Sequence, residues 1–159
     1  VPWKHMPRYG QEASYQIGMD WLEPCDVVED WGCALCYARK FRKGDYIGVD
    51  GTPGKADVIA DLSGYLSRTE GLFMRGILEH NRDWQVILDN ALASFTKRMS
   101  LMLYRPLQLQ EKTIKATDPV ELDLPAGEVI QAIAIFVRDM RIIYPSAHGF
   151  ETLFLLEKP

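Results

Sequence analysis

Two short stretches of this 159-residue chain place a carboxylate at the end of an apolar run, with a glycine one or two residues behind it. In the first stretch Asp30 is followed by Gly32, and in the second Asp50 is followed by Gly51. A carboxylate offers two acceptor oxygens and no proton of its own, which suits a ligand that presents hydroxyl or ammonium groups. A glycine lets the backbone approach such a ligand closely. The two stretches predict a nucleoside cofactor at the carboxyl edge of an open α/β sheet.

Hydrophobic periodicity places the two carboxylates in a chain of alternating strands and helices. Short apolar runs predict strands, and apolar stripes with 3.6-residue spacing predict helices. The expected strands cover residues 25–29, 46–49, 58–60, 71–75 and 99–104, followed by an antiparallel hairpin of residues 141–144 and 151–156. The expected helices cover residues 10–22, 34–42, 84–98 and 128–138. This alternation predicts one α/β domain over residues 1–159, with a mostly parallel sheet covered on both faces.

The composition disfavours several classes of partner. A formal net charge of −4 argues against nucleic-acid binding, which usually needs a basic face. The one dense basic run, residues 39–43, is expected to form the last turn of a helix, where cations complement the helix dipole. No apolar run approaches the roughly 20 residues that span a bilayer, and no secretion leader is expected at the start. We therefore expect neither a nucleic-acid partner nor a membrane.

The three cysteines, Cys25, Cys33 and Cys36, predict free thiols. An odd number without a leader favours a reducing compartment, so a cytoplasmic protein is expected. Cys33 and Cys36 form a C-x-x-C pair, but no second pair completes a zinc site, and we expect no metal. The pair is interpreted as small residues that pack a turn, with a redox role as the alternative.

Four segments, in their order and spacing, resemble the motifs of class I S-adenosylmethionine-dependent methyltransferases. They are residues 28–33, 48–51, 56–62 and 74–80. The resemblance extends over residues 25–105, and residues 150–158 are similar to the last strand of the family. It implies a three-layer Rossmann-like methyltransferase fold with an antiparallel C-terminal hairpin strand. It also implies S-adenosyl-L-methionine (SAM) as the cofactor and S-adenosyl-L-homocysteine (SAH) as its product.

The resemblance implies a cofactor-binding role for each motif. Asp50 would bind both ribose hydroxyls, and Asp61 with the backbone of Leu62 would bind the adenine amino group. Asp30 would orient the first loop or meet the methionine amino group. The complete set assigned to the cofactor is Asp30, Trp31, Gly32, Cys33, Ala34, Asp50, Gly51, Asp61, Leu62, Met74 and Arg75. The alternative for each carboxylate is structural, as a cap, a turn residue or an acceptor of backbone N–H groups.

The sequence departs from the family pattern at two positions. Ala34 and Cys36 stand where the second and third glycines of the first motif are usual, and only Gly32 is kept. A dinucleotide site needs several glycines to seat a pyrophosphate, so this loop suits SAM better than NAD. A methyl group at position 34 costs room beside the cofactor. The departure leaves a catalytically silent SAM- or SAH-binding module as an alternative, and an NAD-type oxidoreductase as a lesser one.

The catalytic candidates follow from the chemistry of methyl transfer. The reaction is an in-line displacement, so alignment is the main task, and a base is needed only when the acceptor must lose a proton. His80 is the expected base, with orientation of the following helix as its alternative role. Further candidates are Glu79, Tyr104 and His148.

The acceptor must be recognised by segments outside the core motifs. We expect the N-terminal helical segment, residues 1–24, the loop 106–126 and the turn 145–149 to contribute to its site. Arg75 and Arg105 flank the same sheet edge and are candidates for binding an anionic acceptor, with solvated surface positions as the alternative. The expected acceptor is a small molecule or a glycan-type group.

Overall fold

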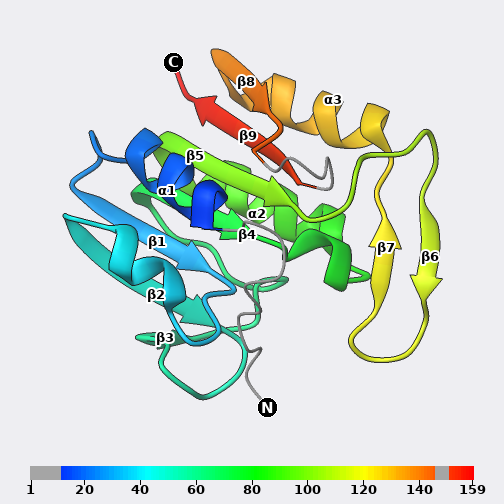
Figure 1. Cartoon of the computed structure of the whole chain (residues 1–159), viewed down its shortest axis with the longest axis horizontal. Helices are drawn as coiled ribbons and strands as arrows, with labels where there is room; N and C mark the ends of the chain where they lie inside the picture. The colour runs from blue at the N-terminus through cyan, green and yellow to red at the C-terminus, as the bar shows by residue number, and fades with distance from the viewer. Residues whose placement is uncertain (1–11, 146–150) are drawn as a thin grey trace.

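The computed structural model describes residues 12–145 and 151–159, and its centre is a seven-stranded sheet (Figure 1). The sheet contains β1 (Val27–Trp31), β2 (Asp45–Asp50), β3 (Val58–Ile59), β4 (Thr69–Arg75), β5 (Phe95–Leu103), β8 (Asp139–Ile143) and β9 (Thr152–Glu157). The strands β6 (Lys112–Lys115) and β7 (Glu121–Asp123) form a separate hairpin beside it. The helices are α1 (Glu12–Trp21), α2 (Trp84–Ser94) and α3 (Ala126–Phe136), with the 3-10 helices η1 (Tyr37–Phe41) and η2 (Leu78–His80).

The strand order of the main sheet is β3-β2-β1-β4-β5-β9-β8. The first five strands in this order are parallel, and β9 runs antiparallel to both β5 and β8. The predicted Rossmann-like sheet with an antiparallel C-terminal hairpin is therefore confirmed. From β1 to β3, each strand along the chain lies next to the one before it, toward one edge of the sheet. The chain then crosses back to the other side of β1, where β4 lies, and β5 follows beside β4. The order reverses between β1 and β4, which is where open α/β sheets bind ligands.

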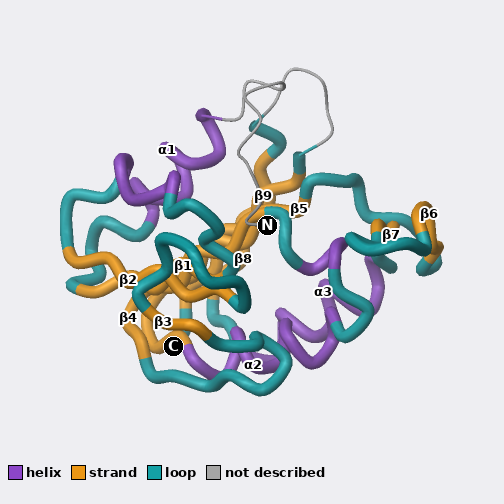
Figure 2. Tube along the Cα trace, turned by 90° about the horizontal axis from the view of Figure 1, so that it is seen from below, coloured by secondary structure: helices purple, strands orange, loops and turns teal. Residues whose placement is uncertain are grey.

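Helices cover both faces of the sheet, with α1 on one face and α2 and α3 on the other (Figure 2). On the α1 face, Met19 packs in a buried cluster with Phe73 of β4. On the opposite face, Leu88 of α2 and Ile133 of α3 share a larger cluster with Leu72. Neighbouring residues of a strand point to opposite faces, so Leu72 and Phe73 enter different clusters. The apolar stripe that predicted α2 is thus the side of the helix that faces the sheet.

The α-helix expected over residues 34–42 does not form. The chain instead makes a turn and then η1. Ala34 and Cys36 have φ values of 48° and 55°, and Cys36 directly precedes η1. A left-handed residue cannot continue a right-handed helix, so an α-helix cannot start at residue 34.

The basic run of residues 39–43 is held by separate partners and does not end an α-helix. Arg39 pairs with Asp57 at 2.5 Å, next to β3. Lys40 pairs with Glu12 of α1 at 2.9 Å. Arg39 and Lys40 do lie in the last turn of a helix, the 3-10 helix η1, and the run also connects η1 to the elements on either side of it.

The boundary between α2 and β5 lies earlier in the chain than expected. Lys97 and Arg98, expected in the last turn of the helix, belong to β5. The chain becomes extended at Phe95, whose side chain is fully buried, so the core determines where the helix stops. In β5, Lys97 pairs with Glu70 at 2.8 Å and Arg98 pairs with Glu157 at 3.4 Å.

Fewer helices connect the strands than the predicted alternation requires. Residues 51–57 and 60–68 join β2, β3 and β4 as loops, and both loops contain turn-forming glycine and serine or proline residues. The expected loop 106–126 carries the β6–β7 hairpin, which projects beside the sheet in Figure 1. Among the residues that the structure describes, no helix is both long and apolar enough to cross a membrane.

Candidate functional site

Two loops meet at the carboxyl ends of β1 and β2. The backbone N–H of Gly32 donates to the carbonyl oxygen of Val49 at 2.7 Å. The Asp50 carboxylate accepts hydrogen bonds from the N–H groups of Ala34 at 2.9 Å and Thr52 at 2.7 Å, one on each oxygen. Asp50 therefore fixes the loop after β1 to its own loop. Because a carboxylate has about four lone-pair positions, each oxygen retains the capacity to accept from a ligand.

The loop after β1 has left-handed backbone at three alternate positions. The φ angles are 76° at Gly32, 48° at Ala34 and 55° at Cys36. These are the positions at which the resemblance places three glycines. The backbone shape that glycine favours is thus kept where two glycines are replaced. An L-residue in this region costs about 1–2 kcal/mol, so Ala34 and Cys36 hold strained backbone.

The two thiols of the C-x-x-C pair fill the space over β2. The Sγ atoms of Cys33 and Cys36 lie 3.4 Å apart, and both cysteines are free and buried. A Cβ atom built on Gly48 would lie 2.6 Å from the Sγ of Cys36 and 2.9 Å from that of Cys33. The sulfur atoms occupy the volume of the missing side chain, as the packing interpretation expects.

Asp30 is the buried carboxyl of this loop region, with 4% of its surface exposed. It accepts a hydrogen bond from the Tyr46 hydroxyl. Burial raises its pKa to about 7, against the lowering effect of that hydrogen bond and with a further rise from the Asp50 charge. The preceding carboxylate, Glu29, accepts instead from the indole N–H of Trp31 at 2.8 Å. Trp31 is fully buried in the cluster under α2, so its side chain belongs to the core.

Asp61 lies beyond the end of β3 and is exposed. One of its oxygens accepts from the backbone N–H of Ser63 at 2.9 Å and from its hydroxyl at 2.8 Å, and these bonds lower the pKa of Asp61. The carbonyl oxygen of Leu62 accepts from the Asn90 amide at 3.0 Å. Met74 is buried in the core at the end of β4. The carboxylate of Asp61 thus shapes a turn in this structure.

A second polar group lies at the carboxyl end of β4, around Arg75. The guanidinium pairs with Glu151 at 2.9 Å and donates to the Ser14 hydroxyl at 3.1 Å. It also lies 4.4 Å from the centre of the Tyr15 ring, in a cation–π contact. Burial raises the pKa of Glu151. Residues far apart in the sequence, from α1, β4 and the position just before β9, therefore meet at one place.

Glu79 adds a further buried carboxyl to this group. One oxygen accepts a hydrogen bond from the backbone N–H of Tyr104, which follows β5. Burial raises the pKa of Glu79, and the charges of His80 and Arg75 lower it. Within the described residues, the second oxygens of Glu79 and Glu151 are buried and have no hydrogen-bond partner.

His80 and Arg105 are both tied to the segment that contains the β6–β7 hairpin. The Nδ1 atom of His80 shares a hydrogen bond with the carbonyl oxygen of Val120 at 3.0 Å. Arg105 pairs with Asp123 at 2.5 Å and with Glu121 at 3.0 Å. Since Arg75 is also paired, an anionic acceptor would have to displace an existing ion pair at either arginine.

Comparisons with solved structures show what this arrangement is similar to. The N-terminal domain of EvdMO1 in the presence of SAH and D-fucose has a TM-score of 0.71 at 10% identity, over 98% of this chain and 85% of that chain. An S-adenosylmethionine-dependent methyltransferase from Mesorhizobium loti has a TM-score of 0.69 at 10% identity, over 95% and 99%. The 1,6-didemethyltoxoflavin-N1-methyltransferase of Burkholderia thailandensis has a TM-score of 0.66 at 15% identity, over 91% and 76%. The chain has the class I methyltransferase fold. No family model and no curated protein matches the sequence.

In this methyltransferase fold, the residues singled out from the sequence fall into three places. The first group lies over β1 and β2, the second follows β3, and the third lies over β4 and β5. The first contains Asp30, Gly32, Cys33, Ala34, Asp50 and Gly51, the second Asp61 and Leu62, and the third Arg75, Glu79, His80 and Tyr104. The turn 145–149, except Pro145, and the candidate base His148 lie outside the described residues.

Sequence reasoning missed several polar residues at this edge of the sheet. Glu151, Ser14 and Tyr15 surround Arg75, and Tyr46 binds Asp30. Glu151 had a usable signal, because it is a carboxylate directly before the apolar run of residues 153–156. Ser14 and Tyr15 had none, since only the packing of α1 over the sheet brings them to β4. In the described part of the chain, no group of His, Cys, Asp and Glu is placed to hold a metal ion.

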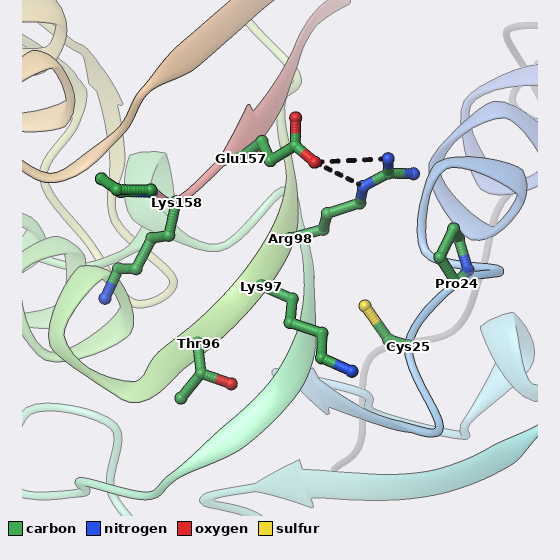
Figure 3. A pocket seen from close by; sticks show the side chains of 8 residues that line it. Pro24, Cys25, Thr96, Lys97, Arg98, Glu157 and Lys158 are labelled. Atoms are coloured by element: carbon green, nitrogen blue, oxygen red, sulfur yellow. Dashed lines mark hydrogen bonds and ion pairs between the residues drawn. The ribbon is translucent and has the colours of Figure 1, made fainter.

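A cavity of about 190 Å³ lies at the opposite edge of the sheet, where β5 begins and β9 ends (Figure 3). Its walls include Cys25, Lys97, Arg98, Glu157 and Lys158. Arg98 is bonded to Glu157 across it, and Lys158 donates to a backbone carbonyl at 2.6 Å. The amino ends of parallel strands are not where this fold type binds ligands, so we assign the cavity to packing.

Proposed function

We propose that this protein is a SAM-dependent methyltransferase acting on a small molecule or a glycan-type group. The observation that carries the proposal is the loop after β1, whose left-handed residues 32, 34 and 36 keep a glycine-like shape and are fixed to Asp50. This loop lies at the point where the strand order reverses, in a methyltransferase fold. One similar structure was determined in the presence of SAH and D-fucose, and another holds 1,6-didemethyltoxoflavin and SAH, which supports the cofactor and the acceptor class.

The residues at this edge fit such a cofactor. Asp50 is half-buried, and each of its oxygens has accepted only one backbone N–H, which leaves acceptor capacity for two ribose hydroxyls. Asp30 lies beneath the same loop and would balance the ammonium group of the methionine part. Asp61 and the Leu62 backbone would border the adenine. We further assign Gly32, Cys33, Ala34 and Gly51 to the walls of this site.

Bound SAM would supply a methyl group on a positively charged sulfur. The chain then has to hold the acceptor in line with that bond, which is a task of position and not of covalent chemistry. Among the candidates for a base, Glu79 has a raised pKa and, within the described residues, one oxygen without a hydrogen bond, and the ring of His80 is oriented by the bond of its Nδ1 atom to Val120. We assign His80, Arg75 and Tyr104 to positioning, and Glu79 to proton transfer for acceptors that must lose a proton.

Calorimetry with SAM and SAH tests the cofactor assignment directly. We expect binding to the folded protein, with NAD unable to compete, because the loop lacks the glycines that seat a pyrophosphate. Absence of SAM and SAH binding by the folded chain at millimolar concentration would overturn the proposal.

A silent binding module is the second candidate, and the strained backbone of Ala34 and Cys36 is the observation that favours it. Transfer of a labelled methyl group from SAM to a panel of sugars, amines and heterocycles separates the two functions. Label transfer to any member supports the enzyme, and SAH binding with no transfer across the panel supports the module.

A further inference from the structure

Two buried carboxylates at the carboxyl end of the sheet each have one oxygen without a partner. Glu79 is 1% exposed and Glu151 is 0% exposed. One oxygen of Glu79 accepts from the Tyr104 N–H, and one oxygen of Glu151 accepts from Arg75. The other oxygen of each has no hydrogen bond in the part of the chain described here. Buried polar atoms of folded proteins are nearly always bonded, so two such atoms in one region call for an explanation.

Arg75 lies beside both carboxyls and serves only one of them directly. Its guanidinium pairs with Glu151 and donates to the Ser14 hydroxyl. Burial raises the pKa of Glu79 and of Glu151, and the charge of Arg75 only partly offsets that rise. A further cation at this place would therefore favour the ionised form of both carboxyls.

The position of the cluster separates it from the proposed cofactor residues. Arg75 ends β4, Glu79 lies in η2 and Glu151 precedes β9, whereas the cofactor residues lie over β1 to β3. The two groups therefore occupy opposite sides of the reversal point between β1 and β4. The first turns of α1, with Ser14 and Tyr15 against Arg75, lie over the cluster on the α1 face. A molecule held here would meet the cofactor across that boundary.

We propose that Glu79 and Glu151 form the acceptor subsite of this protein and that the subsite binds a protonated amine of the acceptor. This inference rests on the function proposed above. An ammonium group donates several hydrogen bonds and carries a positive charge, so it would bond the free oxygens and favour the ionised form of both carboxyls. A neutral sugar hydroxyl would satisfy the hydrogen bonds alone. Both free oxygens are closed to solvent, so the amine can enter only when the side chains around them move.

Thermal unfolding with methylammonium chloride as the probe tests the subsite. The comparison is with sodium chloride at the same ionic strength, on the wild type, the Glu79→Gln/Glu151→Gln variant and an Asp89→Asn control. Asp89 is exposed on α2, so the control makes the same kind of charge change away from the cluster. At a probe concentration about ten times its dissociation constant, we expect the midpoint of the wild type and the control to rise by roughly 3–6 °C. The double variant should not respond.

Each other outcome has a defined meaning. An equal rise in all three proteins, or no rise in the wild type, overturns the amine subsite. A third outcome is that the midpoint of unfolding rises with D-fucose and not with methylammonium, in a way that depends on the two glutamates. That result overturns the cationic assignment in favour of a neutral hydroxyl acceptor. If the double variant does not fold, Glu151→Gln alone replaces it, with the same expectation.

Calorimetry with SAH on the same proteins keeps this inference separate from the proposed function. If SAH binds the wild type and methylammonium has no glutamate-dependent effect, the amine subsite fails and the methyltransferase proposal stands. If SAH does not bind the folded wild type, the proposed function fails, whatever methylammonium does.

Discussion

The Asp50 carboxylate at the end of β2 accepts a hydrogen bond from the backbone N–H of Ala34, in the loop after β1, at 2.9 Å. This bond connects the two acidic strand ends that stand out in the sequence. It gives Asp50 a structural task, holding a left-handed residue in place, in addition to the ribose-binding task that we propose. Variants of Asp50 therefore have to be tested for stability and for binding together.

Replacing Asp50 with alanine should weaken both properties. The backbone N–H groups of Ala34 and Thr52 lose their acceptor, so we expect the free energy of unfolding to fall by about 1–3 kcal/mol. Loss of the charge-assisted hydrogen bonds to the ribose should weaken SAH binding about tenfold or more. Asp50→Asn, which keeps one carbonyl oxygen, should be intermediate. Urea unfolding and calorimetry measure the two effects, and an unchanged SAH dissociation constant in folded Asp50→Ala would refute the ribose assignment.

Replacing Ala34 with glycine should stabilise the protein. Its φ of 48° is unfavourable for an L-residue, and relief of that strain outweighs the extra entropy of glycine in the unfolded chain. We expect a gain of about 0.5–1 kcal/mol in urea unfolding. Ala93→Gly on the exposed side of α2 is the matched control and should lose about 1 kcal/mol. If both variants lose stability equally, the left-handed residue is not strained.

The buried carboxyl of Asp30 should make stability fall as the pH rises. Its pKa is raised from 3.8 to about 7, so the folded protein binds the proton more tightly than the unfolded chain does. Between these two values the unfolded state binds fewer protons, and the free energy of unfolding decreases by at most about 1.4 kcal/mol per pH unit for this group. Below the lower value the contribution is fully present, and above the higher value it is lost.

The Asp30→Asn variant isolates this effect, because asparagine cannot ionise. We expect urea unfolding of the variant to show a shallower decrease than the wild type between about pH 4 and pH 7. Glu79 and Glu151 also have raised pKa values, so some decrease should persist. Identical slopes for the variant and the wild type would exclude Asp30 as the source.

A methyl group at Gly48 should be tolerated only when a thiol is removed. Its Cβ would lie 2.6 Å from the Sγ of Cys36, so Gly48→Ala forces that contact apart. We expect a loss of about 1–3 kcal/mol for the single variant. The double variant Gly48→Ala/Cys36→Ala should lose less than the sum of the two singles, as a double-mutant cycle in urea detects. Additive losses would show that the sulfur does not fill this space.

The succession of strands along the chain was predictable because an acidic residue closes each apolar run. Asp30, Asp50 and Asp61 end successive segments in the sequence, and the loops after the first two strands meet because β1 and β2 are parallel neighbours. The apolar stripe of α2 was predictable for a similar reason, because its buried side chains recur at the helical period.

The failed expectations have specific physical causes. Ala34 and Cys36 have left-handed backbone, although alanine and cysteine usually favour other conformations. Their side chains therefore did not indicate the turn, and the helix predicted over residues 34–42 was wrong. Lys97 and Arg98 have the charge of a helix end, yet the burial of Phe95 converts that segment into a strand. The partners of Arg75 were not predictable because α1 and β9 come from opposite ends of the chain.

The thiols packed over Gly48 also limit which substitutions positions 33, 36 and 48 can accept. Positions 33, 36 and 48 share one small volume, so a larger residue at 48 requires a smaller one at 33 or 36. Among homologous chains, the size of residue 48 should therefore vary inversely with that of residue 36. A chain that regains glycine at position 36 would free position 48 for a side chain, and the two changes should appear together.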